Sequence, residues 1–322
     1  MSAPSRRTPV TVRVPRESQR GRRDAYQAIT DRIIAALERG TVPWRAPWRA
    51  RGHRNALSGR PYRGINLLVL ALTALERGFE DPRWLTYRQA ASRGGHVRRG
   101  EHGTQVVLWK WVEREDQADG EPAERYPLLR LFTVFNVAQC DGLELPPADG
   151  VEAFDPLERA EAIVAGYANG PALHFDADCA YYLPSRDEVR LPPRASFRDT
   201  HGYYATLFHE LAHSTGHPSR LNREGYQVAA RFGSESYSHE ELVAEFGAAF
   251  LGQEAGIDSS RVEQSAAYIA SWLRALRDDR RLAVVAAAQG QRATDRILGR
   301  DHEVTAADSD GQHETNGARD EL

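Results

Sequence analysis

The sequence predicts an α+β protein of two domains, and three observations support this class. The chain has 322 residues, enough for about two domains. The segment 24–147 mixes helical periodicity with alternating strand patterns, whereas 157–300 is almost wholly helical in pattern. The charge also changes sign, because residues 1–112 carry a net charge of +14 and the remaining residues carry −17.

The N-terminal domain, residues 24–147, follows a basic segment, 1–23, that lacks hydrophobic periodicity and is predicted to be a flexible arm. Apolar spacing, glycine and proline positions, and alternation define its elements. The expected elements, in order, are a helix (24–40), a proline- and arginine-rich loop (41–64), a buried helix (65–78), a short helix (86–95) and two paired strands (104–113 and 126–140).

A proline- and glycine-containing linker, 148–156, leads to the C-terminal domain, residues 157–300. The polar, acidic segment 301–322 is predicted to be a disordered tail. The stretch DEVRLP, 187–192, is an expected strand, either part of the scaffold or an edge strand that binds an extended peptide. The expected helices are 157–168, 199–216, 238–257, 261–277 and 280–299.

The stretch FHELAHSTGH, residues 208–217, contains the spacing His-Glu-x-x-His. On a helix, His209 and His213 leave the same face, within reach of one cation. Glu210 lies about 100° around the helix from His209, where it meets a bound water rather than the ion. Zinc lowers the pKa of such a water to about 7, and Glu210 passes its proton to the leaving amine. We therefore predict a zinc peptidase site, with manganese as an alternative ion and Glu210 as catalytic base.

The third metal ligand is expected outside this stretch, although His217 within it could approach the site. The metzincin pattern HExxHxxGxxH would need a histidine where the chain has Ser219, and His217 lies past the helix-ending Gly216. Downstream, Glu241 and Glu245 are one helical turn apart, so one can bind the metal while the other orients a ligand histidine. This resembles the arrangement of gluzincins such as thermolysin and neprilysin. The resemblance implies Glu241 as the ligand and Glu245 as the orienting acid.

Glu241 also has another interpretation. Ser238 and Glu241 form the S-x-x-E pattern of a helix capping box, in which the glutamate folds back to the backbone. In that case Glu240 or Glu245 would have to bind the metal. The group that stabilises the oxyanion stays open among four side chains: Tyr226, Tyr237, His217 and His239.

The basic half of the chain carries five of the six tryptophans. Arginines neutralise phosphates and aromatic rings stack on bases, so this composition favours single-stranded nucleic acid as a partner. The alternative is that tryptophans of the loop pack beneath it as core. The predicted DNA-binding side chains are Trp44, Arg45, Trp48, Arg49, Tyr62, Arg63, Arg98 and Arg99.

Several longer stretches resemble a known family. PRWLTYRQAASRGGHVRRGEHGTQVVLWK is similar to the N-terminal domain of ArdC-type antirestriction proteins, and FHELAHSTGHPSRLNR with RFGSESYSHEELVAEFGAAFL is similar to their metallopeptidase-like domain. The resemblance implies an N-terminal domain that binds single-stranded DNA and a zincin-like C-terminal domain of gluzincin type. It also implies protection of incoming plasmid DNA from restriction during conjugation.

Two rival classes stay open from the residues alone. One is a non-enzymatic DNA-binding protein with a structural metal; the other, a primase-type enzyme, is disfavoured because the basic half holds only eight acids.

The expected partners are single-stranded DNA and a protein or peptide substrate of unknown identity. We expect a cytoplasmic protein without a membrane partner, because no apolar run reaches about 18 residues and the two cysteines lack metal or redox spacing. We also expect DNA affinity to survive deletion of residues 156–322.

Overall fold

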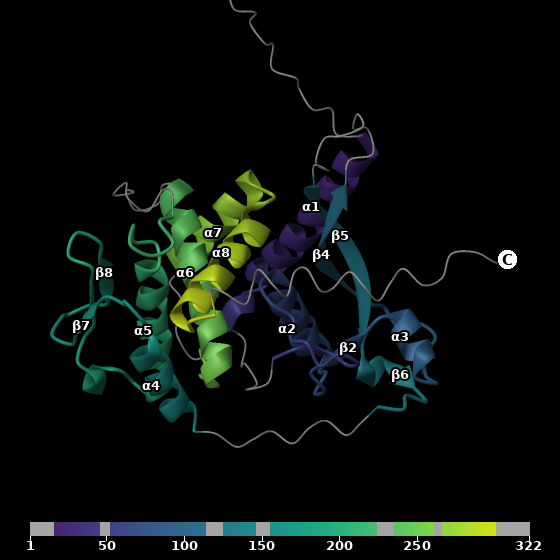
Figure 1. Ribbon diagram of the computed structural model, residues 1–322, viewed down its shortest axis with the longest axis horizontal. Coiled ribbons are helices and arrows are strands. Elements are labelled where there is room, and N and C mark those ends of the chain that lie inside the picture. The colour runs from purple at the N-terminus through teal and green to yellow at the C-terminus, as the bar shows by residue number, and fades with distance from the viewer. Residues whose placement is uncertain are drawn as a thin grey trace, which may run out of the picture.

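Helices and strands divide between the two parts of the chain as the sequence predicts. The N-terminal part mixes strands with helices and the C-terminal part is mostly helical (Figure 1). The predicted α+β class with two domains is therefore confirmed. The structure, a computed structural model, describes residues 16–45, 52–113, 125–145, 155–223, 235–260 and 266–300.

The N-terminal domain is built on a four-stranded sheet with strand order β1-β2-β5-β4, beside a two-stranded pair of β3 and β6. Its longest pairing is the antiparallel one between β4 and β5, in which Thr104 faces Val134 and Glu113 faces Arg125. The elements are α1 (Arg16–Glu38), η1 (Pro43–Arg45), β1 (Arg54–Asn55), α2 (Ile65–Arg77), β2 (Arg83–Leu85), α3 (Tyr87–Ser92), β3 (His96–Val97), β4 (Thr104–Glu113), β5 (Arg125–Asn136), η2 (Val137–Gln139) and β6 (Cys140–Asp141).

The N-terminus of the described chain differs from the prediction. Helix α1 begins at Arg16, so residues 16–23, which we expected in a flexible arm, are helical. The rest of the predicted arm and the predicted tail, 301–322, lie outside the described residues. Strand β4 has the predicted bounds, and its sequence TQVVLWKWVE is rich in the valine and tryptophan that favour strands.

The C-terminal domain consists of helices beside a small sheet with strand order β7-β9-β8. Strand β9, within the DEVRLP stretch, pairs with both neighbours and has no free edge. The hypothesis that this strand captures a peptide by its edge is therefore wrong. The elements are α4 (Pro156–Gly166), β7 (Ala172–His174), β8 (Tyr181–Leu183), β9 (Glu188–Arg190), η3 (Arg194–Ser196), α5 (Thr200–Ser214), α6 (Glu235–Ala255), α7 (Ala266–Asp278) and α8 (Leu282–Ile297). Within the described chain, none of the helices has the length and apolar character needed to cross a bilayer.

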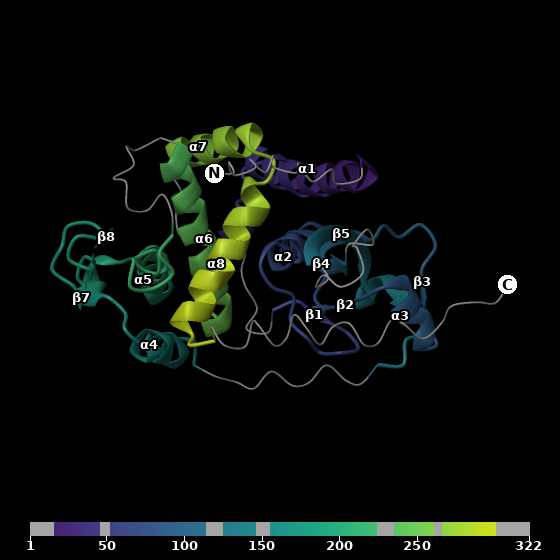
Figure 2. The ribbon, with the colours of Figure 1, turned by 45° about the horizontal axis from the view of Figure 1, so that its top comes forward.

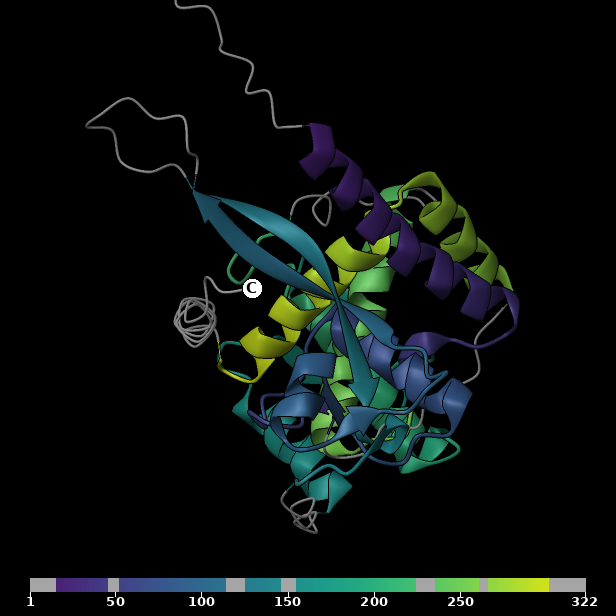
Figure 3. The ribbon, with the colours of Figure 1, turned by 90° about the vertical axis from the view of Figure 1, so that its right-hand side faces the viewer.

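One hydrophobic core joins the two domains. Apolar side chains of α1, η1 and α2 pack in the same cluster as those of α6, α7 and α8. Helix α8 lies between α6 and α2 (Figure 2), and α1 runs beside α7 (Figure 3). Deleting residues 156–322 would expose this core to water. The expectation that DNA affinity survives that deletion does not fit this packing.

The helices of the C-terminal domain cross at unusually close range where two glycines meet. A Cβ atom on Gly290 of α8 would lie 2.9 Å from the Gly247 nitrogen of α6. A Cβ atom on Gly247 would lie 2.8 Å from the Ala212 Cβ of α5. The absence of these Cβ atoms lets α6 approach both α5 and α8, which sets the spacing of the two helices that carry the candidate metal ligands.

Candidate metal centre

Helix α5 starts where the sequence predicts, because Asp199 caps it. The Asp199 side chain accepts a hydrogen bond from the Gly202 backbone N–H at 2.8 Å. Tyr204, Leu207 and Phe208 are buried and hold the helix against α4, the small sheet and α6. This packing fixes the face of α5 from which His209 and His213 project.

Helix α6 begins at Glu235, three residues before Ser238. Ser238 is therefore inside the helix, where its hydroxyl lies 2.8 Å from that of Ser271. The capping box of Ser238 and Glu241 does not form, and that alternative interpretation is wrong. The Glu241 carboxylate is consequently free to face α5.

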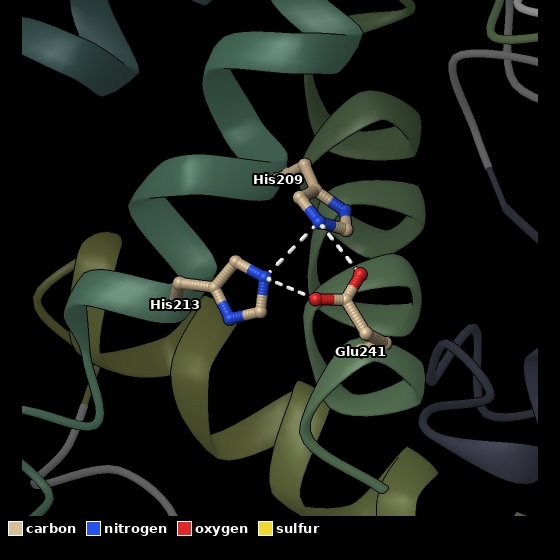
Figure 4. Close-up of side chains that lie close together, drawn as sticks. All are labelled: His209, His213 and Glu241. Carbon is tan, nitrogen blue, oxygen red and sulfur yellow. Dashed lines mark hydrogen bonds and ion pairs between the residues drawn. The ribbon is translucent and has the colours of Figure 1, made fainter. Parts of the chain in front are cut away.

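The three predicted metal ligands lie together. His209 and His213 project from α5 and Glu241 from α6, and their side chains point toward one another (Figure 4). The two imidazole Nε2 atoms are 3.1 Å apart. The Glu241 oxygens lie 3.6 Å from Nε2 of His209 and 3.5 Å from Nε2 of His213. Tetrahedral zinc, with bonds of about 2.0–2.1 Å, would hold its donors about 3.3 Å apart, so this donor set fits a zinc-sized divalent ion.

A glutamate lies behind each histidine, on the side away from the other donors. The Nδ1 atom of His209 is 3.6 Å from Oε1 of Glu245, and that of His213 is 3.3 Å from Oε1 of Glu240. Each glutamate is bound by an arginine: Arg45 donates to Glu245, and Arg223 donates to Glu240. Both imidazoles are therefore oriented with Nε2 toward the ligand site, as outer carboxylates do for metal-binding histidines.

The charged side chains of the cluster shift the pKa values of His209, His213 and Glu241. Burial lowers the pKa of His213, but the carboxylates of Glu240 and Glu241 outweigh burial and raise it to about 10. Burial likewise lowers the pKa of His209, and Glu241 turns the net shift upward. Burial raises the pKa of Glu241, but the two histidines bring it well below its usual range. A divalent cation would have to displace protons from the imidazoles, so metal affinity should increase with pH.

Glu210 occupies the position expected of a general base beside the cluster. It follows His209 directly on α5 and is buried. Its negative charge adds to the effect of Glu240 and Glu241, which outweigh burial and raise the pKa of His213. A buried carboxylate next to a metal site, outside the ligand set, suits proton transfer rather than coordination.

Of the four candidates for oxyanion stabilisation, the structure brings Tyr237 to the site. Its hydroxyl lies 3.2 Å from that of Tyr268. Burial, Tyr268 and Glu241 raise the pKa of Tyr237, so the phenol keeps its proton as a donor. The His217 ring instead contacts Ser219, with Nδ1 2.7 Å from its hydroxyl. Burial lowers the pKa of His239 beside Glu240 and Arg223, and Tyr226 lies outside the described residues.

Two predicted DNA-binding residues belong to the core and the metal centre instead. Trp44 is fully buried between Phe246 and Trp272, with ring centroids 5.0 and 5.1 Å away. Its indole therefore offers no face to a base. Arg45 is bound to the buried Glu245 rather than exposed to a phosphate. For Trp44 and Arg45 the DNA-binding prediction is corrected, and Trp48 and Arg49 lie outside the described residues.

The other predicted DNA-binding residues differ in their availability. Tyr62 is half-buried against the cluster that contains Trp84, and Arg63 is paired with Asp295 of α8. Arg98 is exposed but bound to Glu101 and Asp141. Arg99 is exposed, without an ion pair in the described part of the chain.

An exposed face of the β4–β5 hairpin was missed by the sequence reasoning. Leu108 is 54% exposed and Phe132 is 40% exposed. Arg130, also exposed, pairs across the strands with Leu108 and is two residues from Phe132, so all three share one face. Val106 and Val134 share this face and are buried, so only the part of the face beyond them is exposed, and alternation cannot predict where the covering core ends. β4 packs against α2 and β5 against α1, and in Figure 3 the outer end of the hairpin extends away from the helices.

Two family descriptions match the chain. Residues 23–135 match the N-terminal domain of anti-restriction factor ArdC, and residues 158–289 match a zincin-like metallopeptidase domain. The two matches do not overlap, and the ArdC-type match precedes the zincin-like one along the chain.

Solved structures and curated proteins extend this likeness. A metal-free crystal structure of the antirestriction ArdC protein from the R388 plasmid is 43% identical, with a TM-score of 0.71, covering 87% of this chain and 98% of that one. Its Mn(II)-bound structure is 42% identical, with a TM-score of 0.70 and the same coverage. The protein y4eC of Sinorhizobium fredii is 38% identical over 84% of this chain and 91% of its own. Two DNA primases named TraC from Escherichia coli are 39% and 38% identical over 85% and 88% of this chain, but the chain spans only 27% and 20% of their lengths.

Proposed function

The chain belongs to the ArdC family of antirestriction proteins, and on that premise we propose that it binds single-stranded DNA and carries a zinc-dependent peptidase site. We propose further that it protects incoming plasmid DNA during conjugation. The observation that carries the peptidase proposal is the convergence of two histidines and one glutamate beside the buried Glu210.

The number of donors favours a catalytic site over a structural one. Structural zinc sites are closed by four protein ligands, whereas catalytic sites use three and leave one position for water or substrate. Within the described residues the metal-binding group consists of His209, His213 and Glu241. A bound zinc ion, or manganese as an alternative, would supply a Lewis acid that lowers the pKa of water and polarises a peptide carbonyl.

The remaining chemistry falls to side chains of this chain. Glu210 accepts the proton of the attacking water and delivers it to the nitrogen of the leaving amine. Tyr237, with its raised pKa, donates its hydroxyl proton in a hydrogen bond to the oxygen on which charge develops. Glu240 and Glu245 keep the imidazoles in the orientation that binding requires.

The exposed face of the β4–β5 hairpin is the surface we propose for single-stranded DNA. Phe132 offers a ring for base stacking and Arg130 a charge for phosphate, while Leu108 extends the apolar area. Arg99 is another exposed cation of this domain. These groups replace Trp44 and Arg45 as candidates, because the latter two are engaged in the core and at Glu245.

The proposal is tested by metal analysis combined with a proteomic cleavage screen of wild type against Glu210→Gln. We expect both proteins to hold one divalent ion, and only wild type to produce new peptide termini. The same pair, tested for plasmid transfer into a restricting host, shows whether protection needs peptidase activity. Identical cleavage profiles for the two proteins would refute the peptidase proposal and leave a DNA-binding protein with a structural metal.

A further inference from the structure

Within the described residues, the N-terminal domain contacts the groups around the metal centre through the short helix η1. The indole Nε1 of Trp44 donates to Oε2 of Glu245 at 3.0 Å. The guanidinium of Arg45 donates to both oxygens of the same carboxylate, at 2.9 Å to Oε1 and 3.1 Å to Oε2. Glu245 lies 200 residues further along the chain, on α6 of the C-terminal domain.

This contact is built as a buried charge pair and not as a surface ion pair. The side chain of Arg45 is 16% exposed and that of Glu245 is 8% exposed. Trp44 is fully buried beside them. A two-pronged arginine–carboxylate bond in such surroundings fixes the orientation of the carboxylate as well as its charge.

The orientation of Glu245 matters because its Oε1 atom faces His209. That oxygen lies 3.6 Å from Nδ1 of the imidazole, whose Nε2 faces Glu241 at 3.6 Å. Arg45 thus acts on the ligand through one intervening carboxylate. Without its arginine, Glu245 would lose its charged partner and the hydrogen bonds that fix its carboxylate, while Trp44 still donated to Oε2.

The second histidine, His213, has the same kind of outer groups as His209. His213 faces Glu240, and Glu240 is held by Arg223, whose Nε donates to Oε2 at 3.1 Å. The two series have the same order of groups: arginine, glutamate, histidine, ligand site. In the second series every member comes from the C-terminal domain, whereas in the first the arginine comes from the N-terminal domain.

We propose that Trp44 and Arg45 are positioning residues of the metal centre, so that the N-terminal domain completes the site carried by the C-terminal domain. The inference rests on the metal site of the proposed function but requires neither peptidase activity nor DNA binding. It implies that metal affinity depends on residues which lie outside the zincin-like segment, 158–289.

The test compares Arg45→Ala with a matched control, Arg63→Ala. Arg63 also joins the two domains, since it pairs with Asp295 of α8, but it has no contact with the glutamates of the metal centre in the described structure. Affinity for Zn²⁺ is measured by competition with a chelator, and the Co²⁺-loaded proteins are compared by their visible absorption. We expect Arg45→Ala to bind Zn²⁺ about 10- to 100-fold more weakly, with a changed Co²⁺ spectrum. Arg63→Ala should stay within about threefold of wild type, with an unchanged spectrum.

Two further variants separate positioning from packing. Trp44→Phe keeps an aromatic ring in the core and removes only the N–H donor, so its affinity should fall less than that of Arg45→Ala. Arg45→Lys keeps the charge without the two-pronged geometry and should restore part of the loss. Equal losses for Arg45→Ala and Arg63→Ala would show a general effect of the domain interface and overturn the inference. If Arg45→Ala bound Zn²⁺ as tightly as wild type, this inference would be overturned and the proposed function would stand. If the wild-type protein itself bound no Zn²⁺, both the inference and the proposed function would be overturned.

Discussion

The Nε2 atoms of His209 and His213 lie 3.1 Å apart, and a different glutamate stands behind each ring. The rings are therefore held in the orientation of metal ligands by protein groups alone. Because each of those glutamates is itself held by an arginine, each carboxylate stays in place, and rotation of either imidazole would lose its contact with that carboxylate. Such a site is preorganised, and its outer groups should affect metal affinity in a graded way.

Substitution of the adjacent Glu240 and Glu241 should distinguish the metal ligand from a glutamate that only orients a histidine. Glu241→Ala removes a donor and should lower Zn²⁺ affinity more than 100-fold, beyond the about 10- to 100-fold range expected for outer groups. Glu240→Ala should fall within that range, because Glu240 orients His213 without binding the ion. Chelator competition measures both variants. A greater loss in Glu240→Ala than in Glu241→Ala would assign the ligand role to Glu240.

Glu210→Gln should abolish peptidase activity while leaving metal binding intact. The amide cannot accept the proton of the attacking water, so we expect a loss of about 10²–10⁴-fold in kcat. Zinc content and Tm should remain those of wild type, because Glu210 is outside the ligand set. The measurement is cleavage of a peptide taken from the proteomic screen, with zinc content determined on the same preparation. Reduced zinc content would point to coordination by Glu210 instead.

Two features of the metal centre could be predicted from the sequence because they depend only on neighbouring residues. The spacing of His209 and His213 and the capping role of Asp199 depend on helix geometry within a few residues. The choice between Glu241 and its neighbours depends on where α6 begins. Because α6 begins three residues before Ser238, the alternative capping box of Ser238 and Glu241 lies in the helix interior. Helix ends are set by tertiary packing as much as by local preference, so that choice needed the structure.

The wrong DNA-binding predictions for Trp44 and Arg45 have a different cause. Trp44 and Arg45 have the composition of a nucleic-acid loop, but their partner, Glu245, is 200 residues away in the sequence. No periodicity or motif reports such a contact. The same holds for the strands β7 and β8, which are three residues each and enclose β9. Alternation cannot be detected in so short a strand, and so β9 was taken as a possible edge.

The exposed face of the β4–β5 hairpin should determine affinity for single-stranded DNA. Phe132→Ala removes a stacking surface, and we expect a loss of about 1–3 kcal/mol in binding free energy. Arg130→Gln should reduce the slope of log K against log salt by about 1, because one phosphate contact is lost. Fluorescence anisotropy with a labelled oligonucleotide measures both effects. Tyr181→Ala, which removes an exposed ring from the C-terminal domain, serves as control, and an equal effect there would argue against the hairpin.

Because α5, α6 and α8 cross closely at Gly247, a side chain added at this position should destabilise the protein. Gly247→Ala would bring its Cβ within 2.8 Å of Ala212, next to His213. We expect a loss of stability of about 1–3 kcal/mol from overpacking, with weaker metal affinity as the two helices separate. Gly252→Ala on the same helix is the matched control, since its Cβ would meet nothing closer than 3.5 Å. That variant should gain about 0.5–1 kcal/mol from helix preference. Thermal and urea unfolding distinguish the two, and a destabilised Gly252→Ala would show that α6 responds to any added side chain.

The ion pair of Asp187 and Arg220 should make stability depend on pH in the acid range. Arg220 is almost fully buried, and it also donates to the Ser214 carbonyl at the end of α5, at 2.8 Å. Burial raises the pKa of Asp187, but the bonds from Arg220 outweigh it and lower the pKa below its ordinary value. A carboxyl with a depressed folded-state pKa adds stability above its unfolded pKa, about 3.9, and loses it as the pH falls through the folded value.

Asp187→Asn removes this charge without changing the backbone preference, since asparagine also adopts the left-handed conformation found here at φ 53°. We expect a loss of about 3 kcal/mol in the free energy of unfolding at pH 7, because Arg220 is left as an uncompensated buried charge. The difference from wild type should narrow below about pH 4, where the wild-type carboxyl also takes up a proton. Urea unfolding at pH 7 and pH 3.5 measures it. Glu38→Gln, which breaks the exposed pair with Arg277, should cost less than about 1 kcal/mol. A difference between Asp187→Asn and wild type that stays constant with pH would mean that the pair does not titrate as proposed, and that the end of α5 is held by other contacts.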